Sequence, residues 1–451
     1  MKDDAAVRIY IVCLFLALAA DVPLMPLPVL NVASVPFSFI VILAGAVFPL
    51  TRLGDFRNFV SHRKLLIALA ALFLLSGALS AGLSPFPALF GLRWLARYAM
   101  FLMASFLLLF LFSLDTRRVA FFLKAWLGVA LVLAMIALIE VASDGFSGFL
   151  AGVFREGSRE FFSGRVRAAA TLDHPNTLGC VMALAVLLAV YLRRKAALKT
   201  VVFYPAVVLA GAGLVFSGSR NALIMLMAPL AALLLNRKTI GAALPALGFS
   251  VLLLILLAPS GSRFAYLWRF ADSAKPTAAG GEIHGGAVRA SGDYDALGAR
   301  KMLWRSSWAM FRDRPLFGVG PGGAGRAMKD YAPAELMAMD SEKIANEYLH
   351  AHNGMLNLLA EFGAVGALPA LLILIGLARG AIRRYGFFPP GPEHALILAL
   401  LISFVADAFF YSTFYMVTTA ALLLLFGSSD EGGGRFRPAP ATQADPHEQG
   451  Q

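Results

Sequence analysis

The chain has 451 residues, of which 59% are hydrophobic and 15% are charged, and its mean hydropathy is +0.73. Soluble globular domains are about 45–50% apolar, so this composition and its long apolar runs predict a polytopic membrane protein. The net charge of +12 does not indicate nucleic-acid binding, because no basic stripe with interleaved aromatic residues is present. The two cysteines, Cys13 and Cys180, lie in apolar runs and are interpreted as packing residues.

The apolar runs predict an all-α fold of about 12 transmembrane helices in a single domain over residues 1–427. Lys2 and Arg8 precede the first run, but Asp3 and Asp4 weaken its likeness to a signal peptide, so we expect this span to be retained. The spans are predicted near residues 9–30, 35–50, 65–83, 98–114, 119–142, 173–192, 200–216, 220–235, 240–258, 353–378, 394–410 and 412–427.

The distribution of basic residues predicts the orientation of these spans. In a twelve-span arrangement five basic connections fall on one side, which the positive-inside rule makes cytoplasmic. Both termini are then cytoplasmic, and the Gly-, Pro-, Gln- and Glu-containing tail over residues 428–451 is predicted to be disordered. The connections are marked by Arg52, Arg57, Arg63 and Lys64; by Arg117, Arg118 and Lys124; by Arg193, Arg194, Lys195 and Lys199; by Arg237 and Lys238; and by Arg379, Arg383 and Arg384.

The opposite side carries two larger segments, near residues 143–172 and 259–352. The second is the large periplasmic loop between spans 9 and 10. Its first half is rich in Gly, Ala and Ser and is predicted to be flexible. Residues 299–311 have apolar side chains at helical spacing and predict an amphipathic surface helix. A turn-rich connection is predicted at 315–323, and a second short helix near 334–349.

Arg220 begins a predicted span at its outer mouth, beside Ser217 and Ser219. An arginine here can simply anchor a helix end, but it opposes the cytoplasmic bias of basic residues. Helix N-termini and serines favour anions, and arginine binds phosphate in a fork, which favours an anion-binding role. Arg300 is either the polar face of the amphipathic helix or a second anion-binding group.

His352 and Asn353 stand where the long outer loop meets an apolar span. A lone histidine is more often structural, yet a neutral imidazole near pH 7 can accept a hydroxyl proton. Asn353 either positions a substrate or caps the helix. Glu361 lies nine residues further on, on about the same side of the predicted helix, and is a candidate supporting residue.

A second outer cluster contains Arg165, Arg167, His174, Pro175 and Asn176. It is either a capping sequence with proline early in a helix or a wall of the same anionic pocket, and the sequence supports both interpretations equally.

Acidic residues in apolar surroundings lie near the predicted outer ends of spans rather than at the midplane where transporters place them. They are Asp21, Glu140, Asp173 and Asp407. No metal-ligand set, nucleophile elbow or phosphate-cradling loop is recognisable, so neither a metal nor a cofactor is predicted.

Together these segments resemble the O-antigen ligase and polymerase family of bacterial envelopes. The resemblance covers SGSRNA around Arg220, ARKMLW around Arg300, PLFGVGPGG at 315–323 and HNGMLNLLAEFGAVG from His352, with RVRAAATLDHPNTLG at 165–179 as an earlier element. Each motif is weak alone, but their order on one face of the protein is fairly specific.

The resemblance implies a metal-independent glycosyltransferase of the GT-C-like membrane class, located in the bacterial inner membrane with its site facing the periplasm. It implies undecaprenyl-diphosphate-linked glycan as the donor and lipid A–core, or another glycan, as the acceptor. Arg220 and Arg300 are then the diphosphate-binding residues and His352 the base. Arg167, Asn353, Ser219, His174, Asn176 and Glu361 are the further candidates for substrate binding. A ligase is favoured over a polymerase, and a lipid-linked glycan flippase is the alternative of another class.

Overall fold

The computed structural model describes residues 2–20, 37–115, 117–143, 161–162, 165–172, 174–257, 296–337, 351–386, 391–405 and 421–422. Within these residues the fold is helical except for one antiparallel pair of two-residue strands, β1 (Phe161–Phe162) and β2 (Arg165–Val166). The helices of the first third are α1 (Lys2–Ala20), α2 (Phe37–Ala44), α3 (Val47–Thr51), α4 (Leu53–His62), α5 (Lys64–Leu83), α6 (Ala88–Leu114) and α7 (Arg117–Ala142). The later helices are α9 (Pro175–Arg194), α10 (Thr200–Ser217), α11 (Arg220–Leu234), α12 (Ile240–Leu257), α14 (Ala296–Asp313), α15 (Gly323–Tyr331), α17 (Gly354–Tyr385) and α18 (Pro392–Val405).

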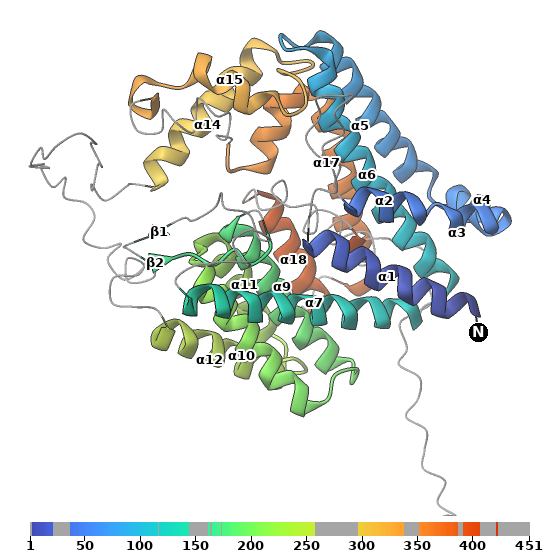
Figure 1. Ribbon diagram of the computed structural model, residues 1–451, viewed down its shortest axis with the longest axis vertical. Coiled ribbons are helices and arrows are strands. Elements are labelled where there is room, and N and C mark those ends of the chain that lie inside the picture. Colours follow the sequence, from blue (N-terminus) through green and yellow to red (C-terminus); the bar gives the residue numbers. More distant parts are fainter. Residues whose placement is uncertain are drawn as a thin grey trace, which may run out of the picture.

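The helices form two groups that share one apolar core (Figure 1). One group surrounds α9, whose side chains from Thr177 to Leu192 are all buried, with α7, α10, α11, α12 and α18 packed around it. The other group contains α5, α6 and α17. A helix that is apolar on all sides is expected at the centre of such a bundle, because it meets protein in every direction.

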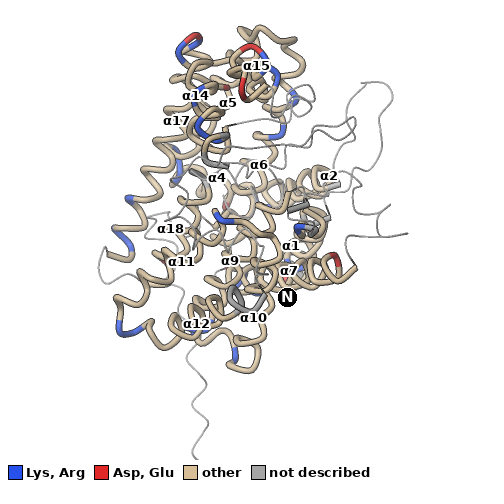
Figure 2. Tube along the Cα trace, turned by 90° about the vertical axis from the view of Figure 1, so that its left-hand side faces the viewer, with Lys and Arg blue, Asp and Glu red and all other residues tan. Residues whose placement is uncertain are grey.

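Helices α14 and α15 lie over one end of the molecule and cover a small separate core (Figure 1). This core joins Leu303 and Met310 of α14, Met328 of α15 and Ala360 of α17. Figure 2 shows acidic and basic segments on α14 and α15, whereas long stretches of the other helices carry neither. The α14–α15 pair is therefore amphipathic and packs its apolar side on the bundle.

The described helices fit a membrane environment. Six of them are long and apolar enough to cross a bilayer, or seven if the bent pair 38–51 and 53–62 counts as one span. Large apolar side chains point outward, including Leu65 and Val201, each 75% exposed. An outward apolar surface of this kind needs lipid to cover it, so the protein is a multi-pass membrane protein.

The prediction of twelve spans is not confirmed by these lengths. Three predicted spans correspond to shorter apolar helices, Arg220–Leu234, Ile240–Leu252 and Pro392–Ser403. Nearly all of the last predicted span, most of the predicted large periplasmic loop and the predicted disordered tail lie outside the described residues. Only the first four residues, 334–337, of the predicted second short helix are described, and they are helical.

Two local predictions were wrong. The basic connection at 52–64 was expected to be a loop, but most of it is α4, whose axis makes an angle of 99° with the preceding helical segment. Helix α6 begins at Ala88, ten residues before the predicted start at 98. Within the added segment, the guanidinium of Arg97 packs over the rings of Trp94 and Phe101, at 5.4 and 6.0 Å from their centroids. Cation–π packing of this kind lets an arginine continue an apolar helix.

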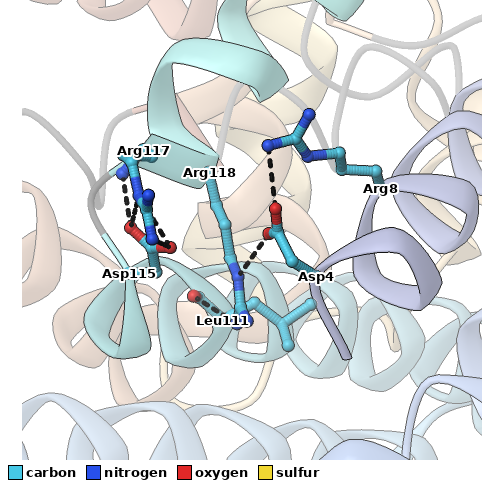
Figure 3. Close-up of polar contacts among 6 residues, drawn as sticks. All are labelled: Asp4, Arg8, Leu111, Asp115, Arg117 and Arg118. Atoms are coloured by element: carbon cyan, nitrogen blue, oxygen red, sulfur yellow. Dashed lines mark hydrogen bonds and ion pairs between the residues drawn. The ribbon is translucent and has the colours of Figure 1, made fainter. Parts of the chain in front are cut away.

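The N-terminal helix is fixed by charged groups where α6 meets α7 (Figure 3). Arg118 is buried, with Nε 3.6 Å from Asp4 Oδ1 and Nη1 donating to the Leu111 carbonyl at 3.3 Å. Asp4 also pairs with Arg8 at 2.8 Å. Asp115 accepts hydrogen bonds from the backbone and the guanidinium of Arg117. These contacts attach α1 to α7 at the end of the bundle that carries the N-terminus.

Candidate functional site

The turn between α10 and α11 places Arg220 at the start of a helix. Gly218 ends α10 with a left-handed backbone, φ +60°. Ser219 then caps α11, its hydroxyl accepting from the Ala222 N–H at 3.3 Å. Arg220, partly buried, is the first residue of α11, so its side chain leaves from the positive end of the helix dipole. This position favours an anion.

Arg167 forms a hydrogen bond with the end of α10, next to this turn. Its side chain is buried, and Nε donates to the Ser217 carbonyl at 3.0 Å while Nη2 donates to Asn176 Oδ1 at 2.9 Å. The neighbouring Ala168 N–H donates to the Phe216 carbonyl at 3.1 Å. The structure thus brings together Arg167, Asn176 and the Ser217–Arg220 turn.

The segment that opens α9 caps this helix and also contacts Arg167. His174 caps the helix, with Nδ1 accepting from the Asn176 N–H at 3.0 Å, and Pro175 occupies the first helical position. The capping interpretation is therefore confirmed for His174. Asn176, through its side-chain bond to Arg167, also lies against the turn that carries Arg220.

Helix α14 brings Arg300 to the same place. Arg300 Nη1 donates to Asn221 Oδ1 at 3.1 Å, and Asn221 follows Arg220 in the first turn of α11. Two arginines separated by 80 positions in the chain thus lie at one helix N-terminus. Asn221 was not predicted as a site residue; its amide beside a candidate arginine was the only available signal.

The far end of α14 is joined to α15. Tyr331, the last residue of α15, forms a side-chain hydrogen bond with Asp313, the last residue of α14. Burial, followed by this bond, raises the pKa of Tyr331. Ser306 of α14 also donates to the Tyr331 carbonyl at 3.1 Å. The orientation of α14, and with it the position of Arg300, therefore depends on α15.

His352 and Asn353 stand directly before α17. Asn353 caps the helix, its Oδ1 accepting from the N–H groups of Met355 and Leu356 at 3.1 and 3.2 Å. His352 has a left-handed backbone, φ +49°, which is uncommon for a residue with a side chain. Both are partly buried. Since α17 packs against α14, its N-terminus belongs to the same end of the molecule as α14.

Glu361 has a supporting role in the structure. Its buried carboxylate accepts from the Gly322 N–H at 2.9 Å. The Glu361 carbonyl accepts from Gly320 N–H at 3.0 Å and from the Ser80 hydroxyl at 2.9 Å. The predicted turn at 315–323 is confirmed, and it lies along α17. Glu361 therefore holds the backbone of this turn in place.

A break in α17 makes room for this turn. Gly363 interrupts the helix with φ +62°, and the next two N–H groups donate to the turn, Ala364 to the Pro315 carbonyl at 2.8 Å and Val365 to the Leu316 carbonyl at 3.1 Å. A Cβ at residue 363 would overlap the Leu316 backbone. Glycine is therefore required at this position.

Among the described residues, no group of three or more histidine, cysteine, aspartate or glutamate side chains is arranged to hold a metal ion. The groups gathered at the α10–α11 turn are instead arginines, hydroxyls and amides. Such groups bind phosphate and sugar oxygens through hydrogen bonds and charge.

The fold defines a multi-pass membrane protein, and the α10–α11 turn gathers arginines at a helix N-terminus. Residues 205–371 match the family described as O-antigen ligase. The matched segment runs from α10 into α17 and contains Arg220, Arg300 and His352. This segment, which covers less than half of the chain, resembles the O-antigen ligase and polymerase family. No curated protein matches the chain.

Proposed function

We propose that this protein is an O-antigen ligase-like glycosyltransferase that transfers a polysaccharide from undecaprenyl diphosphate to lipid A–core. The observation that carries the proposal is the bond from Arg300 to Asn221, which places a second arginine beside Arg220 within the family segment. A donor with a diphosphate needs this kind of clustered positive charge.

In the proposed reaction, the acceptor hydroxyl oxygen attacks the anomeric carbon of the donor glycan. The bond between that carbon and the diphosphate oxygen breaks, and undecaprenyl diphosphate leaves with the bonding electrons. Negative charge grows on the diphosphate during this step. Arg220 and Arg300, already positioned, stabilise that charge more in the transition state than in the ground state.

We propose His352 as the base that takes the proton of the acceptor hydroxyl. An imidazole is suited to this step because it is largely neutral near pH 7 and accepts a proton readily. The left-handed backbone of His352 supports this assignment, since unusual backbone conformations often occur where a side chain must point in a set direction. Asn353 is proposed to bind the acceptor in addition to capping α17.

Arg167, His174, Asn176 and Ser219 are proposed to form the wall of the diphosphate site rather than to take part in bond breaking. Their described contacts are with backbone groups and with one another. In this way they keep the N-terminus of α11 open toward the donor.

We further propose that the site faces the periplasm of the bacterial inner membrane, with both termini in the cytoplasm and with twelve spans. The clustering of lysines and arginines on one set of connections supports this orientation. The chemistry is proposed to be independent of a metal, with arginines providing the positive charge that a metal ion provides in other transferases.

Glycan profiling of a deletion strain tests the function. The strain is complemented with wild type, Arg220→Ala or His352→Ala, at equal membrane levels. Accumulation of long lipid-linked polymer without transfer to lipid A supports the ligase. Single repeats without chain growth would indicate a polymerase instead. If both variants restored a normal profile, the proposed site would be wrong and a transport function would need to be examined.

A further inference from the structure

The proposed reaction gives no role to the carboxylate of Glu140. Glu140 lies near the end of α7 and is buried. Its Oε2 accepts two hydrogen bonds, from the Ala169 N–H at 3.0 Å and from the Ala170 N–H at 2.8 Å. A buried acidic group in an apolar helix is costly and therefore needs a reason.

The backbone that Glu140 holds is in a conformation that needs support. Ala170 has φ +53°, in the left-handed region that residues with a Cβ seldom adopt. Both N–H groups there are buried against the bundle, so they require an acceptor. One carboxylate oxygen provides it for both and fixes the direction of the chain at Ala169 and Ala170.

This same short segment carries the groups that contact the α10–α11 turn. Arg167 bonds the Ser217 carbonyl and Asn176, and the Ala168 N–H bonds the Phe216 carbonyl at 3.1 Å. A continuous set of hydrogen bonds therefore runs from Glu140 through residues 167–170 to the end of α10. Arg220 stands three residues beyond Ser217.

We propose that Glu140 is a positioning residue for the anion-binding turn. It holds the backbone at Ala169 and Ala170, so that Arg167 and Ala168 can fix the carbonyls at the end of α10. Those carbonyls set the direction in which α11 begins, and thus where Arg220 points. The link to catalysis rests on the proposed function, in which this turn binds the diphosphate of the donor.

Transfer kinetics of purified, membrane-reconstituted protein give the first test. Glu140→Ala removes the acceptor, and we expect kcat per folded molecule to fall on the order of 10- to 100-fold, as misplacement of supporting groups does, with an unchanged KM for the acceptor. Glu140→Gln keeps one carbonyl oxygen for both N–H groups and should stay within about threefold of wild type. A normal kcat for Glu140→Ala, with only a lower yield of folded protein, would overturn the proposal.

A double variant tests whether Glu140 acts through Arg167. If it does, Glu140→Ala in an Arg167→Ala background should lower kcat by less than about threefold, because coupled sites are not additive. Full additivity of the two losses would show that Glu140 acts elsewhere and would contradict the proposal.

Hydrogen exchange separates this inference from the proposed function, because it does not depend on activity. In Glu140→Ala, amides of residues 168–172 and of the turn at 217–222 should exchange faster than in wild type, while those of α5 stay unchanged. Arg220→Ala is assayed alongside. If Arg220→Ala kept full transfer, the proposed function would fail, whatever the exchange result. Unchanged exchange at 217–222 would instead overturn the positioning role of Glu140, even if Arg220 proved essential.

Discussion

Two glycine-containing turns in this protein are each linked to a buried glutamate. The turn between α10 and α11 is linked to Glu140 through the backbone at Ala169 and Ala170 and through Arg167. The turn at 315–323 receives Glu361 directly, at the Gly322 N–H. The first turn ends in Ser219 and Arg220 at a helix N-terminus, whereas the second fills a break in α17 with backbone groups.

The two turns lie within one matched segment, 205–371, and differ in the role that we propose for them: the α10–α11 turn in the reaction, and the turn at 315–323 in packing. The turn at 315–323 has the more conspicuous sequence, PLFGVGPGG. It contacts α5, α17 and Ser84, the residue after α5, whose hydroxyl donates to the Val319 carbonyl at 2.6 Å. The turn at Arg220 has a plainer sequence but gathers charge. Changes in the turn at 315–323 should therefore reduce stability, and changes in the α10–α11 turn should reduce rate.

The largest effect is expected for Arg220→Ala. Removing one preorganised group that stabilises transition-state charge lowers rates about 10²- to 10³-fold. The measurement is the transfer rate of purified protein, with the thermal unfolding midpoint as a check on folding. A rate within tenfold of wild type would place the diphosphate elsewhere.

Gly363→Ala should affect stability instead. The new Cβ would overlap the Leu316 backbone, and φ is +62°, so we expect a loss of about 3 kcal/mol or more. The thermal unfolding midpoint in detergent measures it. Gly376→Ala in the same helix is the matched control, because its Cβ meets nothing within 4 Å. Equal midpoints for the two variants would contradict the assigned role of the break in α17.

Asn221→Ala should have an intermediate effect on rate. It removes the acceptor that holds Arg300 at 3.1 Å, and we expect a rate on the order of tenfold lower, as for the loss of one hydrogen bond to a charged group. Lys301→Ala, an exposed position on α14, serves as the control and should be silent. If Asn221→Ala were also silent, the bond to Arg300 would be unimportant for the reaction.

The smallest expected effect is a pH-dependent contribution of Asp115 to stability, at the end of the bundle that carries the N-terminus. Burial raises the pKa of Asp115, but the hydrogen bonds from Arg117 and the charges of Arg117 and Arg118 outweigh it, so the pKa lies below its ordinary value of 3.8. The stabilisation is then complete above that value and is lost as the pH falls through the lowered pKa.

Unfolding midpoints of wild type and Asp115→Asn measure this contribution. The difference should be present at pH 6 and shrink in acid below about pH 4. An equal difference at both pH values would show that charge is not its source.

The comparison also shows what the sequence can predict. Capping was one of two interpretations of Asn353 and of the His174–Pro175 pair, and the structure shows these caps. The sequence can indicate them because capping depends on residues only two or three positions away. The cap formed by Ser219 was not predicted. The helical spacing of the apolar residues in 299–311 predicted α14, in which Leu303 is buried.

Features that depend on contacts between distant segments were missed. The sequence placed Glu140 near an outer helix end but gave no sign that it accepts from Ala169 and Ala170. Helix α15 was not predicted, because its apolar side is short and is recognisable only from its packing against α14 and α17. The early part of α6, which was also missed, contains Arg97 packed on Trp94, a contact that is compatible with a charged residue in an otherwise apolar helix.

The decisive experiment compares the transfer rates of Arg300→Ala and Arg305→Ala in purified, reconstituted protein. Both arginines lie on α14, but Arg300 contacts the first turn of α11 and Arg305 is exposed. We expect Arg300→Ala to lose about 100-fold or more in rate, while Arg305→Ala transfers like wild type. Equal activity of the two variants would contradict the claim that the α10–α11 turn and α14 together form the site.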